Sequence, residues 1–498
     1  MSKDNIPEET LDLTEILRVR REKLEKLRAA GRDPFIKTRF ERTAKSAEIK
    51  EAFEEWENKD VKLCGRLMSK RDMGKAFFAD LMDERGRIQL YVRIDDLGEE
   101  AFGEFKKWDI GDIVGVEGFV FRTRRGEISV HVKSVVLLSK SLLPLPEKFH
   151  GLTDTETRFR QRYVDLIVNP EVRRIFEIRS RFIKYIRDFL DARGYMEVET
   201  PVLNTISGGA AARPFMTHHN ALNMEMYLRI ATELHLKRLV VGGIERVYEI
   251  GRIFRNEGMD TRHNPEFTTV ELYQAYADFN DMMDLFETLL SGAAKELLGT
   301  YEVSWQGETI DLSPGFERLT MAGAVKKYLG LDFMAAETDE QAEKLAASVG
   351  VELPKEKERT WGNYLYECFD QRVEEKLVQP TFITMHPVDV SPLAKRSPTD
   401  ERLTERFELF ICRSEMGNAF SELNDPIDQL ERFRKQAELR AKGDSEANMM
   451  DDDFITALEY GLPPTGGLGI GIDRCVMLLT GNDSIREVIL FPTMKPID

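Results

Sequence analysis

Cysteine is scarce in this chain, and its four cysteines lie far apart in the sequence. No two of Cys64, Cys368, Cys412 and Cys475 form a C-x-x-C pair. This spacing argues against a disulfide framework or a zinc site and fits a reducing compartment, so we expect a cytoplasmic protein. The seven histidines include no H-E-x-x-H arrangement. Any metal ion is therefore expected on carboxylates.

Long apolar runs are also missing. No apolar stretch approaches the roughly 18 residues that a membrane-spanning helix needs. Residues 1–9 are polar and lack the apolar core of a secretory signal, so we expect neither a membrane helix nor a signal peptide. Hydrophobic residues make up 42% of the 498 residues and charged residues 32%. These proportions fit a soluble chain of two or three domains.

The net charge of −17 argues at first against a nucleic-acid partner, but the charge is unevenly distributed. Residues 1–150 contain 30 Lys and Arg against 29 Asp and Glu, whereas the remaining residues contain 41 against 59. A nucleic acid should therefore dock first on residues 1–150.

The spacing of apolar residues predicts an α+β protein built from several parts. Residues 1–60 form an N-terminal helical segment. Residues 61–141 contain five or six short strands with Gly and Asp in the turns, among them 113–116 and 119–122, which is typical of a small barrel. Prolines and glycine mark a linker at 142–155. Residues 156–498 form a further domain, in which residues 226–278 alternate strand and helix patterns and residues at about 335–375 form a helical insertion.

A long helix is expected over residues 171–193. Its apolar face is too broad for one-sided packing on a surface, so it should bury against a sheet or a second copy of the chain.

Charged residues interrupt two apolar strands in residues 244–278. The first strand leads into a loop that contains Arg255 and Glu257, and the second, over residues 267–273, contains Glu271 and Tyr273. Such charges are costly inside a sheet unless they are paired or face a site. Arg255 could grip a phosphate with two hydrogen bonds. An internal Arg–Glu salt bridge is the structural alternative.

Three further segments carry polar residues in a pattern that suits a nucleotide site. Residues 466–474 predict a glycine-rich strand that enters a helix near Asp473, so that a flat group can approach the backbone while Arg474 faces an anion. A tight turn with a structural arginine fits equally well. In residues 415–422, Glu415 and Glu422 could share a divalent cation, or be solvated. Residues 231–238 could simply cap a helix at Thr232.

Together these segments resemble the three motifs of the class II aminoacyl-tRNA synthetases. The first motif matches residues 194–201, the second the Phe-Arg-Asn-Glu loop at 254–257, and the third residues 467–474. Within that class the segments 262–268, 231–234 and 420–425 resemble the bacterial lysyl-tRNA synthetases, and residues 65–71 and 74–78 resemble their anticodon-binding OB domain.

The resemblance implies an α+β fold, in which an OB barrel precedes an antiparallel catalytic sheet flanked by helices. It also implies a homodimer that takes ATP, L-lysine and tRNA(Lys), with Mg²⁺ as the cofactor. Catalysis would rest on Arg255, Glu257 and Arg474. The residues expected at ATP are Arg255, Glu257, His263, Asn264, Phe267, Glu415 and Arg474, with Glu415 and Glu422 at Mg²⁺.

The same resemblance implies a lysine pocket and an anticodon surface. The pocket would consist of Gly209, Glu233, Glu271, Tyr273, Asn418, Phe420 and Glu422. The anticodon would contact Lys70, Arg71, Phe78 and Gln89, with Phe78 stacked on a base, unless Phe78 is a core residue and Phe77 faces outward.

Three alternatives remain open at this stage. An aspartyl- or asparaginyl-tRNA synthetase shares the layout, but Glu233 and Glu271 would repel a carboxylate side chain. The synthetase-like enzyme that attaches lysine to elongation factor P lacks the N-terminal OB domain. A non-catalytic RNA-binding paralogue is disfavoured by the presence of Arg255 and Arg474.

Overall fold

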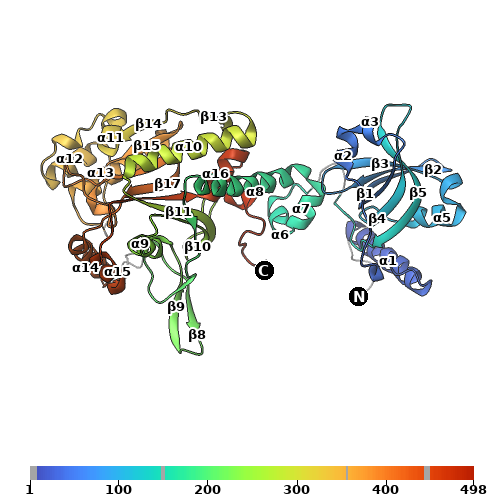
Figure 1. Cartoon of the computed structure of the whole chain (residues 1–498), viewed down its shortest axis with the longest axis horizontal. Helices are drawn as coiled ribbons and strands as arrows, with labels where there is room; N and C mark the ends of the chain where they lie inside the picture. Colours follow the sequence, from blue (N-terminus) through green and yellow to red (C-terminus); the bar gives the residue numbers. More distant parts are fainter. Residues whose placement is uncertain (1–7, 147–151, 355–356, 442–448, 498) are drawn as a thin grey trace. The chain divides into compact units, whose positions relative to one another are not determined.

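The computed structural model describes residues 8–146, 152–354, 357–441 and 449–497. The chain divides into two compact units, residues 1–153 and 154–498. The predicted N-terminal segment, linker and insertion fall partly outside the described residues, at 1–7, 147–151 and 355–356. The α+β class is confirmed, because a closed barrel occupies the first unit and a large sheet with helices the second (Figure 1).

The first unit is a five-stranded barrel in the order β1-β2-β3-β5-β4. Its strands are β1 Asp60–Asp72, β2 Ala76–Met82, β3 Arg87–Arg93, β4 Ile113–Arg122 and β5 Ile128–Ser139. The helices around it are α1 Glu8–Ala29, α2 Ser46–Glu51, α3 Phe53–Trp56, α4 Ile94–Leu97 and α5 Glu99–Lys107.

Along the barrel strands, buried side chains alternate with side chains on the outer face. Burial alternates strictly along β2 and β3, which places one set of residues in the core and the other on the outer face. One expectation was wrong in detail: the segments 113–116 and 119–122 are a single strand, β4. Gly118 lets the strand continue past a bulge, because a side chain there would strike the backbone of His131.

The second unit is built on an eight-stranded sheet in the order β14-β15-β16-β17-β18-β11-β10-β6. Neighbouring strands are antiparallel except for β14 with β15 and β10 with β6. The strands are β6 Met196–Glu197, β10 Arg246–Phe254, β11 Glu266–Ala275, β14 Glu317–Thr320, β15 Thr381–Thr384, β16 Arg406–Ile411, β17 Ser414–Ser421 and β18 Thr465–Gly471.

Three helices cover one face of this sheet and form the main core. They are α8 Pro170–Asp191, α10 Phe279–Leu298 and α16 Ile472–Thr480, which lie side by side in Figure 1. Phe182 and Ile186 of α8 are fully buried against this core, so the prediction that this helix packs on a sheet is confirmed. The smaller helices α6 Thr155–Arg160, α7 Arg162–Val168 and α17 Ile485–Val488 pack nearby.

Other elements surround the remaining parts of the sheet. The helices α11 Met321–Leu329, α12 Asp339–Ser348 and α13 Trp361–Arg372 form a separate apolar cluster beside β15. The helices α9 Glu233–Val241, α14 Pro426–Ala441 and α15 Asp452–Glu459 form another. A two-stranded sheet joins β12 Glu302–Trp305 and β13 Glu308–Asp311.

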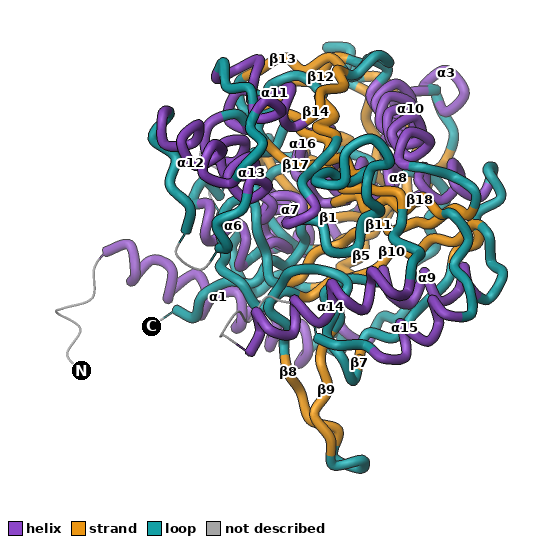
Figure 2. The backbone as a smooth tube through the Cα atoms, turned by 90° about the vertical axis from the view of Figure 1, so that its left-hand side faces the viewer, coloured by secondary structure: helices purple, strands orange, loops and turns teal. Residues whose placement is uncertain are grey.

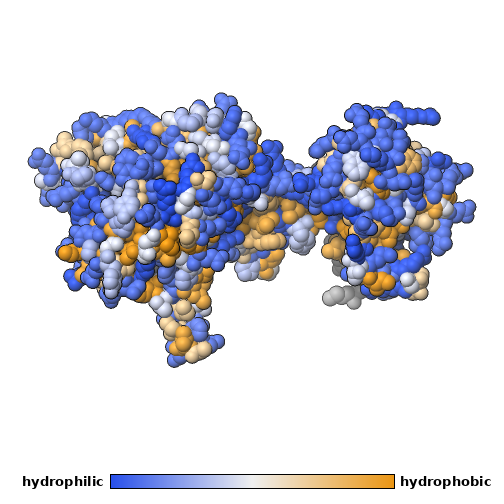
Figure 3. Space-filling model, viewed as in Figure 1, coloured by the Kyte–Doolittle hydropathy of each residue, from blue (hydrophilic) through white to orange (hydrophobic). Residues whose placement is uncertain are grey.

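A three-stranded sheet projects from the second unit. It contains β7 Leu203–Asn204, β9 Met224–Leu228 and β8 Met216–His219, and the β8–β9 hairpin extends away from the body in Figure 2. Apolar residues gather on this hairpin in Figure 3, where Met216 and Leu222 are exposed. Within the described residues, no helix combines the length and apolar character needed to span a membrane.

Candidate active site

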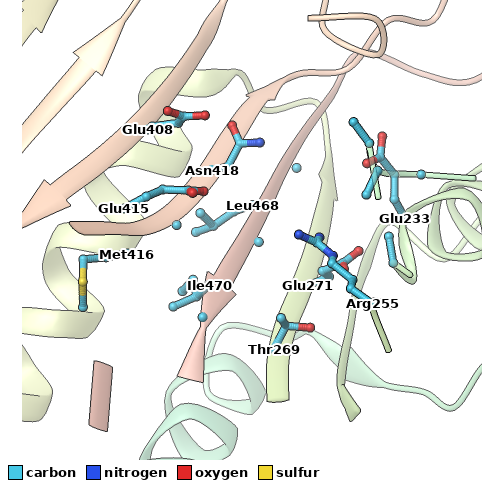
Figure 4. A pocket seen from close by; sticks show the side chains of 18 of the residues that line it. Glu233, Arg255, Thr269, Glu271, Glu408, Glu415, Met416, Asn418, Leu468 and Ile470 are labelled. Carbon is cyan, nitrogen blue, oxygen red and sulfur yellow. The ribbon is translucent and has the colours of Figure 1, made fainter. Parts of the chain in front are cut away.

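A cavity of about 470 Å³ opens on the face of the large sheet away from the core helices. Strands β11, β17 and β18, the loop after β10 and the start of α9 form its walls (Figure 4). Every residue that the sequence suggested for ATP or lysine lines it. These are Gly209, Glu233, Arg255, Glu257, His263, Asn264, Phe267, Glu271, Tyr273, Glu415, Asn418, Phe420, Glu422 and Arg474.

Glycines in β18 create the space inside this cavity. In the antiparallel register Gly467 lies opposite Tyr273, and Gly469 lies opposite Glu271. A side chain at Gly467 would overlap both the Glu422 carboxylate and the Tyr273 ring. Because the glycines of β18 have no side chains, they leave space in which the side chains of β11 and β17 face the cavity.

Three carboxylates gather at the end of the cavity beside α9. Glu233 and Glu422 are almost fully buried, and both pair with the buried ammonium of Lys237. Glu271 accepts hydrogen bonds from the backbone N–H of Thr232 at 3.2 and 3.3 Å, at the N-terminus of α9. Burial, followed by the charge of Glu233, raises the pKa of Glu271 to about 7. Such a pocket favours a cation.

Two guanidinium groups also line the cavity, and that of Arg255 lies beside Glu271 in Figure 4. The Arg255 guanidinium lies 5.2 Å from the centre of the Phe267 ring. Within the described residues it forms no ion pair, whereas Glu249 of the same segment forms an internal salt bridge with Arg229 at 2.5 Å. The Arg474 guanidinium donates to the Glu415 carbonyl oxygen at 2.6 Å and lies 3.3 Å from His263 Nε2. Arg255 and Arg474 can therefore receive an anion.

A buried network fixes the position of Arg474. Arg179 of α8 pairs with Asp473 at 2.6 Å and donates to the Thr268 hydroxyl at 3.0 Å. Asp473 also accepts the backbone N–H of Thr268 at 2.6 Å. These contacts tie α8, β11 and the start of α16 together, so the residue after Asp473 is held at the cavity.

Comparison with known proteins identifies this arrangement. The family described as tRNA synthetases class II (D, K and N) matches residues 154–495, and the OB-fold nucleic acid binding domain matches residues 61–138. The chain is 58% identical to the lysine–tRNA ligase of Pelotomaculum thermopropionicum, over 97% of this chain and 96% of that protein. The corresponding protein of Syntrophomonas wolfei is 58% identical, over 98% and 99%.

The chain belongs to the lysine–tRNA ligases. The prediction of a lysyl-tRNA synthetase with an OB domain and a class II catalytic domain is therefore confirmed.

The expectation that Glu415 and Glu422 share a cation is wrong, because the two residues lie too far apart along β17. Glu415 is the second residue of β17 and Glu422 follows the last, and seven residues of strand span about 20 Å. Glu422 is also paired with Lys237. The sequence reasoning missed Glu408 of β16, which lies beside Glu415 and Asn418 in Figure 4. Charged residues alternating along β16 could have revealed it.

Phe78 and Gln89 lie on one outer face of the OB barrel, whereas Phe77 is in the core. The Phe78 ring stacks on Tyr91 at 4.9 Å, and Gln89 accepts a hydrogen bond from the Ser129 hydroxyl at 3.0 Å. Arg71 is exposed and lies opposite Phe78 in the β1–β2 register.

The ammonium of Lys70 is directed elsewhere. It donates to the carbonyl oxygens of Phe105, Lys106 and Trp108 at the end of α5. Burial lowers the pKa of Lys70 to about 8. This lysine therefore serves as a helix C-terminal contact, and its three donors are already used.

Proposed function

We propose that this chain activates L-lysine with ATP and transfers the lysyl group to the 3′ end of tRNA(Lys). The observation that carries the proposal is a single cavity that brings together three carboxylates, two of them almost fully buried, and the guanidinium groups of Arg255 and Arg474. Carboxylates suit the ammonium groups of lysine, and guanidinium groups suit the phosphates of ATP.

The reaction takes place in two steps. In the first, a carboxylate oxygen of lysine attacks the α-phosphorus in line, the bond to the β-phosphate oxygen breaks, and pyrophosphate leaves. Arg255 holds the α-phosphate and Arg474 the γ-phosphate, which neutralises charge as the transition state forms. In the second step, the terminal 3′-OH of tRNA attacks the lysyl carbonyl carbon and releases AMP.

The nucleotide is positioned by residues around Arg255. The Phe267 ring stacks on the adenine, while Glu257, His263 and Asn264 contact the nucleotide. Asp260 orients His263 through a contact of 2.8 Å with Nδ1, and Asn264 is anchored by donating to the Glu266 carbonyl at 2.7 Å. Such positioning supplies much of the acceleration, because the chemistry needs little proton transfer.

Lysine lies beside α9, with its ammonium groups among Glu233, Glu271 and Glu422. The Oε1 atom of Glu422 has no hydrogen-bond donor among the described residues, so it remains open to the substrate. Tyr273, Asn418 and Phe420 complete the walls beside Gly209. An aspartyl or asparaginyl substrate would place a carboxylate or a neutral amide among three carboxylates, which disfavours that alternative.

The residues present fit a Mg²⁺ ion at the phosphate end. Glu408 and Glu415 offer two carboxylates on neighbouring strands, and Mg²⁺ is commonly held by one or two carboxylates together with substrate phosphates. The described residues contain no cluster of three or more potential metal ligands that could form an all-protein site. The ion would neutralise charge on the phosphates, while Arg255 and Arg474 orient them.

Glu408→Gln should raise the Mg²⁺ concentration needed for half-maximal lysine activation. The increase should reach at least the ~10-fold loss that is typical when a metal site loses a supporting group. The measurement is a Mg²⁺ titration of lysine-dependent ATP–pyrophosphate exchange. Glu405→Gln, which alters a glutamate outside the cavity, is the control and should leave the titration unchanged. An unchanged Mg²⁺ titration for Glu408→Gln would show that Glu408 does not bind the ion.

The outer face of the barrel reads the anticodon through Phe78, Gln89 and Arg71. Phe78→Ala should raise the KM for tRNA by about 10- to 100-fold, because stacking of a base on an aromatic ring contributes ~1–3 kcal/mol. Lysine activation without tRNA should be unaffected. Phe35→Ala removes another exposed ring from the same unit and should alter neither value. Equal losses in both variants would contradict the assignment.

The chain acts in the cytoplasm as a homodimer. Support for the dimer comes from β6, which lies at the edge of the large sheet and follows α8. Met196, Val202 and Leu203 in this region are exposed apolar residues that a second copy would cover. Sedimentation equilibrium should give twice the mass of the chain, and a monomer at micromolar concentration would contradict the dimer.

Aminoacylation tests the proposal as a whole. The purified chain, with ATP and Mg²⁺, should attach lysine to a tRNA(Lys) transcript, whereas aspartate and asparagine should not be attached to their own tRNAs. Failure to charge any tRNA, with binding to tRNA retained, would favour a non-catalytic RNA-binding paralogue.

A further inference from the structure

Lys237 is a cation buried among residues that should bind a cation. Its side chain is fully buried, and it extends from α9 to pair with Glu233 at 2.5 Å and with Glu422. Three aromatic rings surround the ammonium, with Phe420 at 5.3 Å and Tyr273 and Phe454 each at 6.0 Å. The protein therefore keeps an ammonium of its own beside the place where the substrate ammonium groups are expected.

The charges in this region explain what such a cation could do. Three carboxylates in a buried pocket without a cation would take up protons, because burial and mutual repulsion disfavour their charged forms. One ammonium cancels one of these charges and leaves two, and the substrate lysine has two ammonium groups. With Lys237 present, the number of carboxylates left without a protein ammonium therefore equals the number of ammonium groups on the substrate.

We propose that Lys237 is an internal counter-ion that sets the charge of the lysine pocket and positions Glu233 and Glu422 for the substrate. This inference rests on the proposed lysine pocket and extends it. Lys237 does not line the cavity. It therefore acts through the two carboxylates and is a positioning residue.

The surroundings of Lys237 support this function. Burial opposes the charge of Lys237, but Glu233 and Glu422 outweigh burial and raise its pKa above the ordinary value. Burial raises the pKa of Glu422, and the Lys237 ammonium opposes that rise. The titratable groups facing the site are Glu233 and Lys237 from α9, Glu271 and Tyr273 from β11, Glu422 after β17, and Arg255 near Glu271.

The test measures the lysine KM in ATP–pyrophosphate exchange with the full chain between pH 6.5 and 9. Wild-type enzyme must first show lysine-dependent exchange, and its absence would count against the proposed function itself. Lys237→Met should raise the lysine KM about 100-fold at pH 7, because one partner of a buried ion pair is lost. The ATP KM and the kcat at saturating lysine should change much less.

The pH profile separates a counter-ion from a packing residue. In wild-type enzyme the lysine KM should become constant above a certain pH. In Lys237→Met this pH should be higher by about one unit or more, because the remaining carboxylates ionise at higher pH. Lys237→Arg retains the charge, so its KM should stay within about tenfold of wild type with an unshifted profile. Arg238→Met is the control, because Arg238 is adjacent in α9 but pairs with Asp451 and Asp453 outside the cavity.

Three results would overturn the inference. The first is a Lys237→Met enzyme with wild-type KM and pH profile. The second is a loss confined to kcat. The third is a folded Lys237→Arg enzyme whose KM rises 100-fold or whose profile shifts. If Lys237→Met does not fold, the third result, measured with Lys237→Arg, decides whether the inference stands.

Discussion

Replacing Arg255 by alanine should lower the kcat of lysine-dependent ATP–pyrophosphate exchange by about 10³-fold, which is the scale of losing one preorganised donor at developing charge. The guanidinium is available for this function because it forms no ion pair among the described residues and lies over the Phe267 ring. Its Nε atom is buried and has no hydrogen-bond partner among the described residues, so it is available to donate to a substrate oxygen.

Two further variants test whether the effect of Arg255→Ala comes from the guanidinium group at this position. Arg255→Lys keeps the charge but loses the planar pair of donors, so it should recover only part of the activity. Arg252→Ala, on β10 just before the loop that holds Arg255, is outside the cavity and exposed and should retain wild-type exchange. If Arg255→Ala retains more than about a tenth of the wild-type kcat, the guanidinium does not stabilise the transition state.

Replacing Glu271 by glutamine should abolish most lysine activation without unfolding the protein. We expect kcat/KM for lysine to fall about 10³-fold, because a charge-assisted contact to a buried ammonium is lost. Glutamine preserves the acceptor for the Thr232 N–H. Glu266→Gln, on the same strand outside the cavity, is the matched control. Wild-type exchange with lysine in Glu271→Gln would show that the pocket is wrongly assigned.

The stability of Glu271→Gln should differ from wild type in a pH-dependent way. Burial raises the pKa of Glu271 to about 7 in the folded protein, so ionisation costs folding free energy. Below the pKa that Glu271 has in the unfolded chain, the carboxyl is neutral in both states, and the variant has no stability advantage over wild type. As the pH rises towards 7, the free energy of unfolding of the variant should increase relative to wild type, and above pH 7 the difference should be constant. Thermal unfolding at pH 4 and pH 8 measures it, and a lower Tm for the variant at pH 8 would contradict the account.

Local sequence patterns predicted that Arg255, Glu271 and Tyr273 lie on one hairpin, and the structure places them there. For residues 466–471 the patterns left a strand and a tight turn open, and the structure forms a strand. The functions of these residues were implied by the family resemblance. The alternation of buried and outward residues on β2 likewise agreed with the expected orientation of Phe78.

The residues that were missed depend on contacts distant in sequence. Glu408 reaches Glu415 only because β16 pairs with β17, and Glu422 is removed from that end of the cavity by the length of the strand. Lys237 meets Glu422 across 185 positions of sequence. The family resemblance placed Lys70 at the anticodon, yet its ammonium donates to carbonyl oxygens at the end of α5. Pairing partners of this kind have no local pattern.

The most direct test of the central claim is ATP–pyrophosphate exchange with each of the twenty amino acids, without tRNA. The carboxylates of Glu233, Glu271 and Glu422 and the Arg255 guanidinium line one cavity, which suits the activation of an amino acid with a cationic side chain. We therefore expect strong exchange with lysine, and no comparable exchange with any other amino acid. Exchange with aspartate or asparagine but not with lysine would contradict the central claim.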